Sequence, residues 1–338
     1  MIVTTTYPEK AGRLLGAHAE RIHLVADLPP HREWTEEHAR IGAAFDAPVE
    51  PIELPEVDTT NLSVPGPRGP IGVCLYTPQV LVEADEDGRR PAFVWIHGGA
   101  FISGDLDGPE ADHTSRRIAH ATGIPVISVD YRLCRDGVCH PAPHDDVWAA
   151  YLWVREGGHG IATDPARVVV GGASAGGCLA GTIGVHGRDA ATSPAAVVLI
   201  YPTCHYPVPA PDAELSHLLD QLPPLFRSDS SDHDALNWNY LGGRADQPPG
   251  HVDNIGWALP GQADDLTGFP PTYIENCEFD ELRASGEKFA TQLREVGCDV
   301  EMHTVPGEIH GHLSVPGLPS ATQTCANMAT YLKAVTTR

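Results

Sequence analysis

Basic residues and long apolar runs are scarce in this chain of 338 residues, and each scarcity excludes a class of function. Lysine occurs only at Lys10, Lys288 and Lys333, and the formal net charge at pH 7 is -23. Such a surface repels phosphates, so we expect no nucleic-acid partner and no attraction to an anionic membrane. No stretch approaches the ~20 apolar residues of a membrane-spanning helix, so we expect no stable membrane association.

Signals for disulfides and for secretion are missing as well. The eight cysteines include no Cys-x-x-Cys pair, and only Cys134 and Cys139 lie close together in the sequence. The first residues, Met1-Ile-Val-Thr-Thr-Thr-Tyr-Pro, have neither the basic nor the apolar region of a signal peptide. We therefore expect reduced thiols and a cytoplasmic protein.

Apolar segments of strand length alternate with segments of helical periodicity along most of the chain. The predicted strands are 71–76, 93–97, 126–130, 168–171, 197–201, 272–277 and 299–305. The predicted helices between and after them are 142–156, 175–185, 282–296 and 320–335. This alternation predicts an α/β fold, in which a mostly parallel sheet is covered by helices on both faces.

Two segments interrupt the alternation and divide the chain. Residues 1–50 look helical and separate, because apolar side chains recur at helical spacing over 34–45. Residues 203–264 are irregular and rich in Pro, Asp, Gly and His. We predict a core made of 51–202 and 265–338, with the two other segments folding together as a lid.

A possible nucleophile lies between a predicted strand and a predicted helix. Residues 172–176 read Gly-Ala-Ser-Ala-Gly. A Gly-x-Ser-x-Gly at such a junction is typical of a nucleophile elbow, where Gly172 and Gly176 allow a tight turn that exposes the Ser174 hydroxyl. A serine hydroxyl is a weak nucleophile, so it needs a histidine base and an acid that orients the base.

The acid and the base are expected in loops after later strands, in the order Ser, acid, His. The strand before the last one ends in Glu278-Phe-Asp-Glu-Leu, which places Asp280 just beyond it. The last strand leads to Pro-Gly-Glu-Ile-His-Gly-His, which places His310 in the final loop. By spacing alone, Glu278 and Glu281 remain alternatives for the acid, and His312 for the base.

An oxyanion hole is predicted where His97-Gly-Gly-Ala-Phe follows a strand. Successive small residues let backbone N–H groups converge on a developing negative oxygen. We assign the donors to Gly99, Ala100 and Ala175, with His97 and Gly98 supporting the turn.

Five motifs together resemble the hormone-sensitive lipase-like group of α/β-hydrolases. They are His97-Gly-Gly-Ala-Phe, Asp130-Tyr-Arg-Leu, Gly172-Ala-Ser-Ala-Gly-Gly, Glu278-Phe-Asp-Glu-Leu-Arg and Ile309-His-Gly. The resemblance implies an α/β-hydrolase fold with a two-part helical cap, built from the two irregular segments. It also implies Ser174 as nucleophile, Asp280 as acid and His310 as base, and it supports the oxyanion donors named above.

The predicted function is a serine carboxylesterase that hydrolyses small, short-to-medium acyl esters through an acyl-enzyme, without a cofactor. We expect no metal, because Pro141 and Pro143 spoil the helical pair that His140 and His144 would otherwise form. The alternatives are a deacylase, thioesterase or acyltransferase specialised for one complex metabolite, and a non-catalytic receptor on the same fold. A homodimer formed through the last strand and helix is plausible.

Large apolar side chains of the lid are expected either to contact the substrate or to form the lid's own small core. They are Trp34, Phe45, Phe226, Trp238 and Trp257. A few of them facing the serine would make an apolar acyl pocket.

Overall fold

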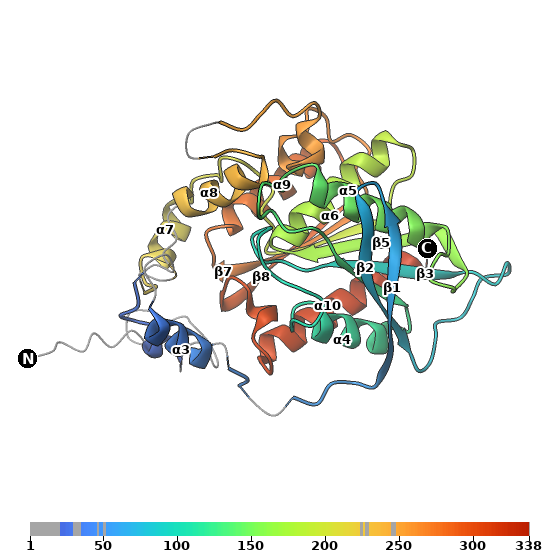
Figure 1. The fold of residues 1–338 in the computed structure, drawn as a ribbon, viewed down its shortest axis with the longest axis horizontal. Helices are drawn as coiled ribbons and strands as arrows, with labels where there is room; N and C mark the ends of the chain where they lie inside the picture. The colour runs from blue at the N-terminus through green and yellow to red at the C-terminus, as the bar shows by residue number, and fades with distance from the viewer. Residues whose placement is uncertain are drawn as a thin grey trace, which may run out of the picture.

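A twisted sheet forms the centre of the protein, in a computed structural model that describes residues 21–29, 35–45, 47–49, 52–223, 226, 230–244 and 248–337 (Figure 1). Its strands are β1 (Val57–Gly66), β2 (Gly69–Pro78), β3 (Arg90–Ile96), β4 (Val126–Asp130), β5 (Thr163–Ala173), β6 (Ala196–Ile200), β7 (Thr272–Phe279) and β8 (Val300–Ile309). They lie side by side in the order β1-β2-β4-β3-β5-β6-β7-β8. Only the β1–β2 and β2–β4 pairs are antiparallel, so the predicted, mostly parallel sheet is confirmed.

Helices cover both faces of the sheet, as Figure 1 shows. One face packs against α4 (Asp112–Thr122) and α10 (Pro319–Thr336), and the other against α5 (Ala142–Arg155), α6 (Ala175–Asp189) and α9 (Arg283–Glu295). In strand β5 the run 168–170 consists of three valines, because both faces of the sheet are buried there. Val168 and Val170 enter one core, whereas Val169 enters the other, because successive side chains point to opposite faces.

Two elements of the fold have no clear apolar signal in the sequence. Strand β1 pairs with β2 over its whole length, but among its ten residues only Val57 and Val64 are buried, because it is an edge strand. Helix α4 is rich in polar and charged residues and buries mainly Ile118 and Ala119 among its apolar side chains. Each of the seven predicted strands overlaps an observed one.

Helices from the two irregular segments lie together at one end of the molecule (Figure 1). Helix α3 (Glu36–Phe45) comes from the first segment, and α7 (Ala213–Leu219) and α8 (Ser230–Tyr240) come from the second. Phe45 and Leu218 share one apolar cluster with Phe279 and Ile309, which end β7 and β8. The two segments therefore pack on each other and on the carboxyl end of the sheet.

All eight cysteines are free thiols. Among the described residues, we find no helix with the length and apolar character needed to cross a bilayer.

Candidate active site

Ser174 occupies a strained turn between β5, which ends at Ala173, and α6, which begins at Ala175. Its φ is 53° and its ψ is -116°, a backbone conformation that costs a non-glycine residue about 1–3 kcal/mol. A Cβ on Gly176 would overlap the carbonyl oxygen of Ile96, and a Cβ on Gly172 would overlap that of Gly176. Only glycine fits at these two positions, so close packing of β3, β5 and α6 fixes the turn.

The structure brings Ser174, His310 and Asp280 into one hydrogen-bonded chain. The Nε2 atom of His310 lies 2.9 Å from Oγ of Ser174, and its Nδ1 atom lies 2.7 Å from Oδ2 of Asp280. A carboxylate only accepts hydrogen bonds, so Nδ1 carries the proton and Nε2 is left to accept the serine proton. The other oxygen of Asp280 accepts the amide N–H of Leu282 at 2.9 Å, which fixes the carboxylate.

Opposing effects act on the pKa of His310. Burial lowers it, whereas the charge and hydrogen bond of Asp280, with the charge of Glu110, raise it. The carboxylates prevail, and the pKa lies above its ordinary value of 6.5. The site therefore stabilises the imidazolium form, which a general base needs after it has taken up a proton.

The alternative acids and base lie elsewhere. Glu278 accepts a backbone N–H of β8 at 2.7 Å, and Glu281 bonds to His233 at 3.0 Å. The ring of His312 bonds through Nε2 to Thr324 at 2.8 Å. These hydrogen bonds go to partners other than Ser174, whereas His310 is hydrogen-bonded to Ser174.

The three residues predicted to donate to an oxyanion line the same cavity as Ser174. Gly99 and Ala100 have φ values of 106° and 55°, in the turn after β3, and Ala175 begins α6. Their amides have no hydrogen-bond acceptor in the described part of the chain. Gly98 differs, because it donates its N–H to the carboxylate of Glu110.

Glu110 is a site residue that the sequence did not reveal. Its two carboxylate oxygens accept the Gly98 N–H and, at 2.7 Å, the hydroxyl of Tyr201. The ring of Tyr201 packs edge-on against His310, with centroids 4.8 Å apart. Glu110 follows the turn motif in an acidic loop, where nothing in the sequence distinguishes it from the nearby Asp105.

Tyr131 stabilises the turn after β3 through contacts with His97 and Gly98. Its ring stacks on His97 with centroids 4.6 Å apart, and its hydroxyl donates to the carbonyls of His97 and Gly98, at 3.1 and 3.2 Å. Burial raises its pKa well above 10, so the hydroxyl stays protonated and remains a donor. His97 and Gly98 therefore stabilise the turn, and neither is part of the described cavity lining.

A cavity of about 350 Å³ opens onto Ser174. Its wall combines the site residues above with side chains from the loops and the cap. The lining residues are Gly99, Ala100, Phe101, Ser103, Glu110, Ser174, Ala175, Thr203, His233, Leu236, Asn237, Leu282, His310, Gly311 and Ser314. No lysine or arginine is part of this described wall.

The large cap side chains that the structure describes are not in this wall. Phe45 and Phe226 contact each other, with ring centroids 5.2 Å apart, inside the apolar cluster of the cap. These two residues serve the lid's own core because they lie where α3 packs against the second segment. Trp34 lies outside the described residues.

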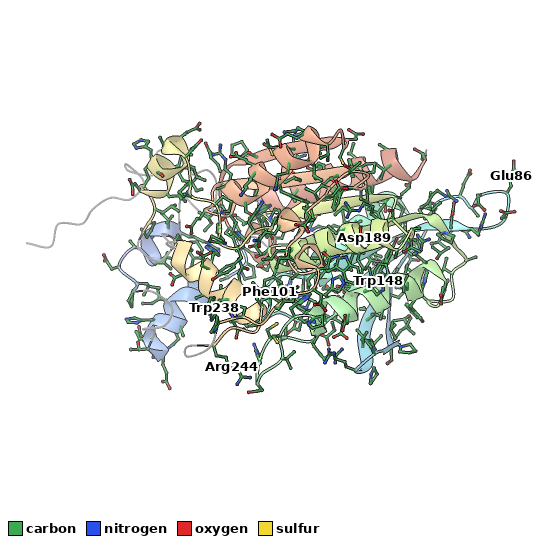
Figure 2. The ribbon with its side chains drawn as sticks, turned by 90° about the horizontal axis from the view of Figure 1, so that it is seen from above. Glu86, Phe101, Trp148, Asp189, Trp238 and Arg244 are labelled. Atoms are coloured by element: carbon green, nitrogen blue, oxygen red, sulfur yellow. The ribbon has the colours of Figure 1, made fainter. Side chains whose placement is uncertain are left out.

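Trp238 and Trp257 are likewise absent from the described cavity lining. Trp257 stacks on His186 at 3.7 Å between centroids, and its Nε1 donates to Asp189 at 3.0 Å. Trp238 lies on α8, and its Nε1 donates to the carbonyl of Arg244 at 3.3 Å; Figure 2 labels Trp238 and Arg244. Among the described residues, the cap residues that line the cavity are Thr203, His233, Leu236 and Asn237.

Comparisons with known proteins agree with this architecture. Residues 93–314 match the family described as having the α/β-hydrolase fold. The chain is 34% identical to esterase LipI of Mycobacterium tuberculosis over 82% of each chain, and 33% identical to carboxylesterase NlhH of the same species over 75% of each. A solved α/β-hydrolase enzyme from the metagenome of Lake Arreo superposes with a TM-score of 0.75 at 28% identity, covering 96% of this chain and 98% of that one.

The chain therefore belongs to the α/β-hydrolase family. Its curated relatives include proteins named esterases and carboxylesterases, as the resemblance to the hormone-sensitive lipase-like group predicted.

Proposed function

We propose that the protein is a serine carboxylesterase that hydrolyses small, short-to-medium acyl esters. The observation that carries this proposal is the hydrogen-bonded chain Ser174–His310–Asp280, which opens onto the cavity. The names of the relatives support the same reaction class.

In the first half-reaction, the Ser174 oxygen attacks the ester carbonyl while Nε2 of His310 takes the serine proton. The carbonyl oxygen becomes an oxyanion, and the amides of Gly99, Ala100 and Ala175 donate hydrogen bonds to it. His310 then gives its proton to the leaving alcohol as the C–O bond breaks, which leaves an acyl-enzyme.

In the second half-reaction, water replaces the alcohol. His310 takes a proton from the water, whose oxygen attacks the acyl carbon, and returns that proton to Ser174 as the acid is released. Asp280 stabilises the imidazolium in both halves. All groups used in these steps belong to the chain itself.

The cavity supports a small substrate. Its volume of about 350 Å³ lies near the lower end of the range for ligand pockets, and Phe101, Leu236 and Leu282 give it apolar walls. We take residues 1–50 and 203–264 as the cap that closes this cavity over a core of 51–202 and 265–338.

Two properties of the whole molecule complete the proposal. The eight free thiols are compatible with a reducing, cytoplasmic location. Strand β8 is one of the two edge strands of the sheet, and we infer that a homodimer would form through β8 and α10.

Hydrolysis of p-nitrophenyl esters, from acetate to long acyl chains, tests the function. We expect turnover of short chains by the wild type and a loss of about 10⁴-fold or more in Ser174→Ala. Ser63→Ala, on exposed β1, serves as the matched control and should retain full activity. Activity that survives in Ser174→Ala would refute the assignment of Ser174 as the nucleophile. A wild type that is inactive on every ester would refute the esterase function and favour a specialised deacylase or a receptor.

A further inference from the structure

The loop after β7 carries two neighbouring carboxylates, and each one holds a histidine. Asp280 binds His310, and Oε2 of Glu281 binds Nδ1 of His233, on the cap helix α8, at 3.0 Å. The two imidazole rings face the same cavity, with centroids 6.4 Å apart and planes at 66°. A second oriented imidazole therefore stands beside the proposed general base.

The proton position on His233 follows from its partner. Glu281 is 5% exposed, and its carboxylate can only accept, so Nδ1 of the neutral ring carries the proton. When the ring is neutral, Nε2 presents a lone pair and acts as an acceptor. In the described part of the chain this atom has no hydrogen-bond partner, and His233 lines the cavity.

Asn237 lies one turn further along α8 and offers a second acceptor. Its Nδ2 donates at 3.2 Å both to Oγ1 of Thr203 and to the carbonyl of His205. A carbonyl cannot donate, so this contact fixes the orientation of the amide. The remaining Oδ1 has no partner among the described residues, and Asn237 also lines the cavity.

The wall formed by His233 and Asn237, hereafter the acceptor wall, favours ligands that carry hydrogen-bond donors. A ligand without a donor would leave both acceptors unpaired when it displaced water from them, which weakens its binding. Glu110 adds a negative charge to the same cavity, and no lysine or arginine is in the described lining. A ligand carboxylate is therefore disfavoured.

The position of the acceptor wall relates it to the alcohol part of the ester. The leaving alcohol must lie beside His310, because that ring protonates it. The carbonyl oxygen lies toward Gly99 and Ala100, in the turn after β3. His233 neighbours the His310 ring, so it lies on the leaving-group side of the site.

We propose that the acceptor wall recognises a hydroxyl group on the alcohol portion of the substrate. Preferred substrates are then monoesters of a diol or polyol rather than simple alkyl esters, and His233 is a specificity-determining residue. This inference rests on the proposed ester hydrolysis, and it adds the class of alcohol that is released.

Two esters with the same number of heavy atoms test the inference, namely propyl butyrate and 2-hydroxyethyl butyrate. They differ only in a terminal methyl against a hydroxyl, and acid release in a pH-stat gives kcat/KM for each. We expect the hydroxyethyl-to-propyl ratio to fall about tenfold in His233→Leu relative to the wild type. Taking this ratio within each enzyme cancels differences in the amount of folded protein, and comparing it between enzymes cancels the intrinsic reactivity of the esters.

His251→Leu is the matched control, because the side chain of His251 is 86% exposed and lies outside the cavity lining. Its ratio should equal that of the wild type. In Glu281→Gln the ring loses its charged partner, and we expect an intermediate ratio. An unchanged ratio in His233→Leu, or an equal fall in His251→Leu, overturns the inference alone, whereas a wild type that hydrolyses neither ester overturns the proposed function and this inference with it.

Discussion

Replacing Glu110 with Gln tests how the oxyanion turn is held in place. Both partners of the carboxylate, the Gly98 N–H and the Tyr201 hydroxyl, donate to it. A glutamine side chain has one acceptor and one donor group, so it matches only one of these partners unless Tyr201 reverses its hydroxyl. Tyr201 is fully buried, and a reversed hydroxyl proton would need another acceptor.

The expected magnitudes follow from these contacts. One weakened hydrogen bond to a buried donor costs about 1–2 kcal/mol in the free energy of unfolding. Gly98 directly precedes Gly99 and Ala100, and removal of a whole oxyanion donor costs about 10²–10³-fold in kcat. A displaced turn retains part of its contacts, so we expect kcat for a short p-nitrophenyl ester to fall about 10- to 100-fold, with KM nearly unchanged.

The same substitution has an electrostatic effect that the pH profile isolates. The charge of Glu110 is one of the influences that raise the pKa of His310. The neutral imidazole is the active base, so kcat/KM is lost as the pH falls through this pKa, and Glu110→Gln should move that acidic limb to lower pH.

Glu86→Gln is the matched control, because Glu86 lies exposed at the tip of a loop far from the cap (Figure 2). We expect it to alter neither kcat nor the acidic limb. A Glu110→Gln enzyme with wild-type kcat and an unshifted limb would refute the role of this carboxylate.

Three further predictions concern the acid, the elbow and the buried histidines. Asp280→Asn removes the main influence raising the pKa of His310, so the acidic limb of kcat/KM should move to lower pH and kcat should fall by about 10⁴-fold; an unshifted limb would contradict the assignment. Gly176→Ala forces a Cβ against the last carbonyl of β3, and urea unfolding should report a loss of about 3 kcal/mol or more, whereas a loss below about 1 kcal/mol would mean that the turn can relax. Burial lowers the pKa of His140 and of His205 to about 4, so the unfolded state binds more protons below about pH 6.5 and the urea midpoint should drop between pH 6.5 and 4; a constant midpoint would argue against neutral buried rings.

The local signals in the sequence were sufficient to propose Ser174 and His310, and the fold places these two side chains in hydrogen-bond contact. Ser174 lies between two glycines that only a tight turn requires, and Asp280 and His310 each follow an apolar strand at the same edge of the sheet. These positions depend on strand ends, which the pattern of apolar residues marks. The choice between Asp280 and Glu281 as the acid needed the family resemblance. If the loop began one residue later, Glu281 rather than Asp280 would point toward the histidine.

The side chains that line the cavity could not be predicted from the sequence, because contacts between segments far apart in the chain bring them together. Size and apolar character singled out Phe45 and Trp257, but a large aromatic residue packs equally well inside a cap as against a substrate. His233 is one of 18 histidines, and its sequence neighbours give no sign that it meets a carboxylate 48 residues away. Glu110 reaches Tyr201 across 91 residues, so only the folded sheet and loops bring it to the turn.

The loop after β7 carries two adjacent carboxylates, and we propose that one orients the general base and the other orients a residue that determines substrate specificity. Asp280 orients a ring that arrives from the end of β8, within the core, whereas Glu281 orients a ring that arrives from the cap helix α8. A change at Asp280 should therefore slow every ester alike, because it acts on the shared proton transfer. If the acceptor wall recognises the alcohol portion, a change at Glu281 should instead alter the relative rates of esters of different alcohols, because Glu281 orients His233.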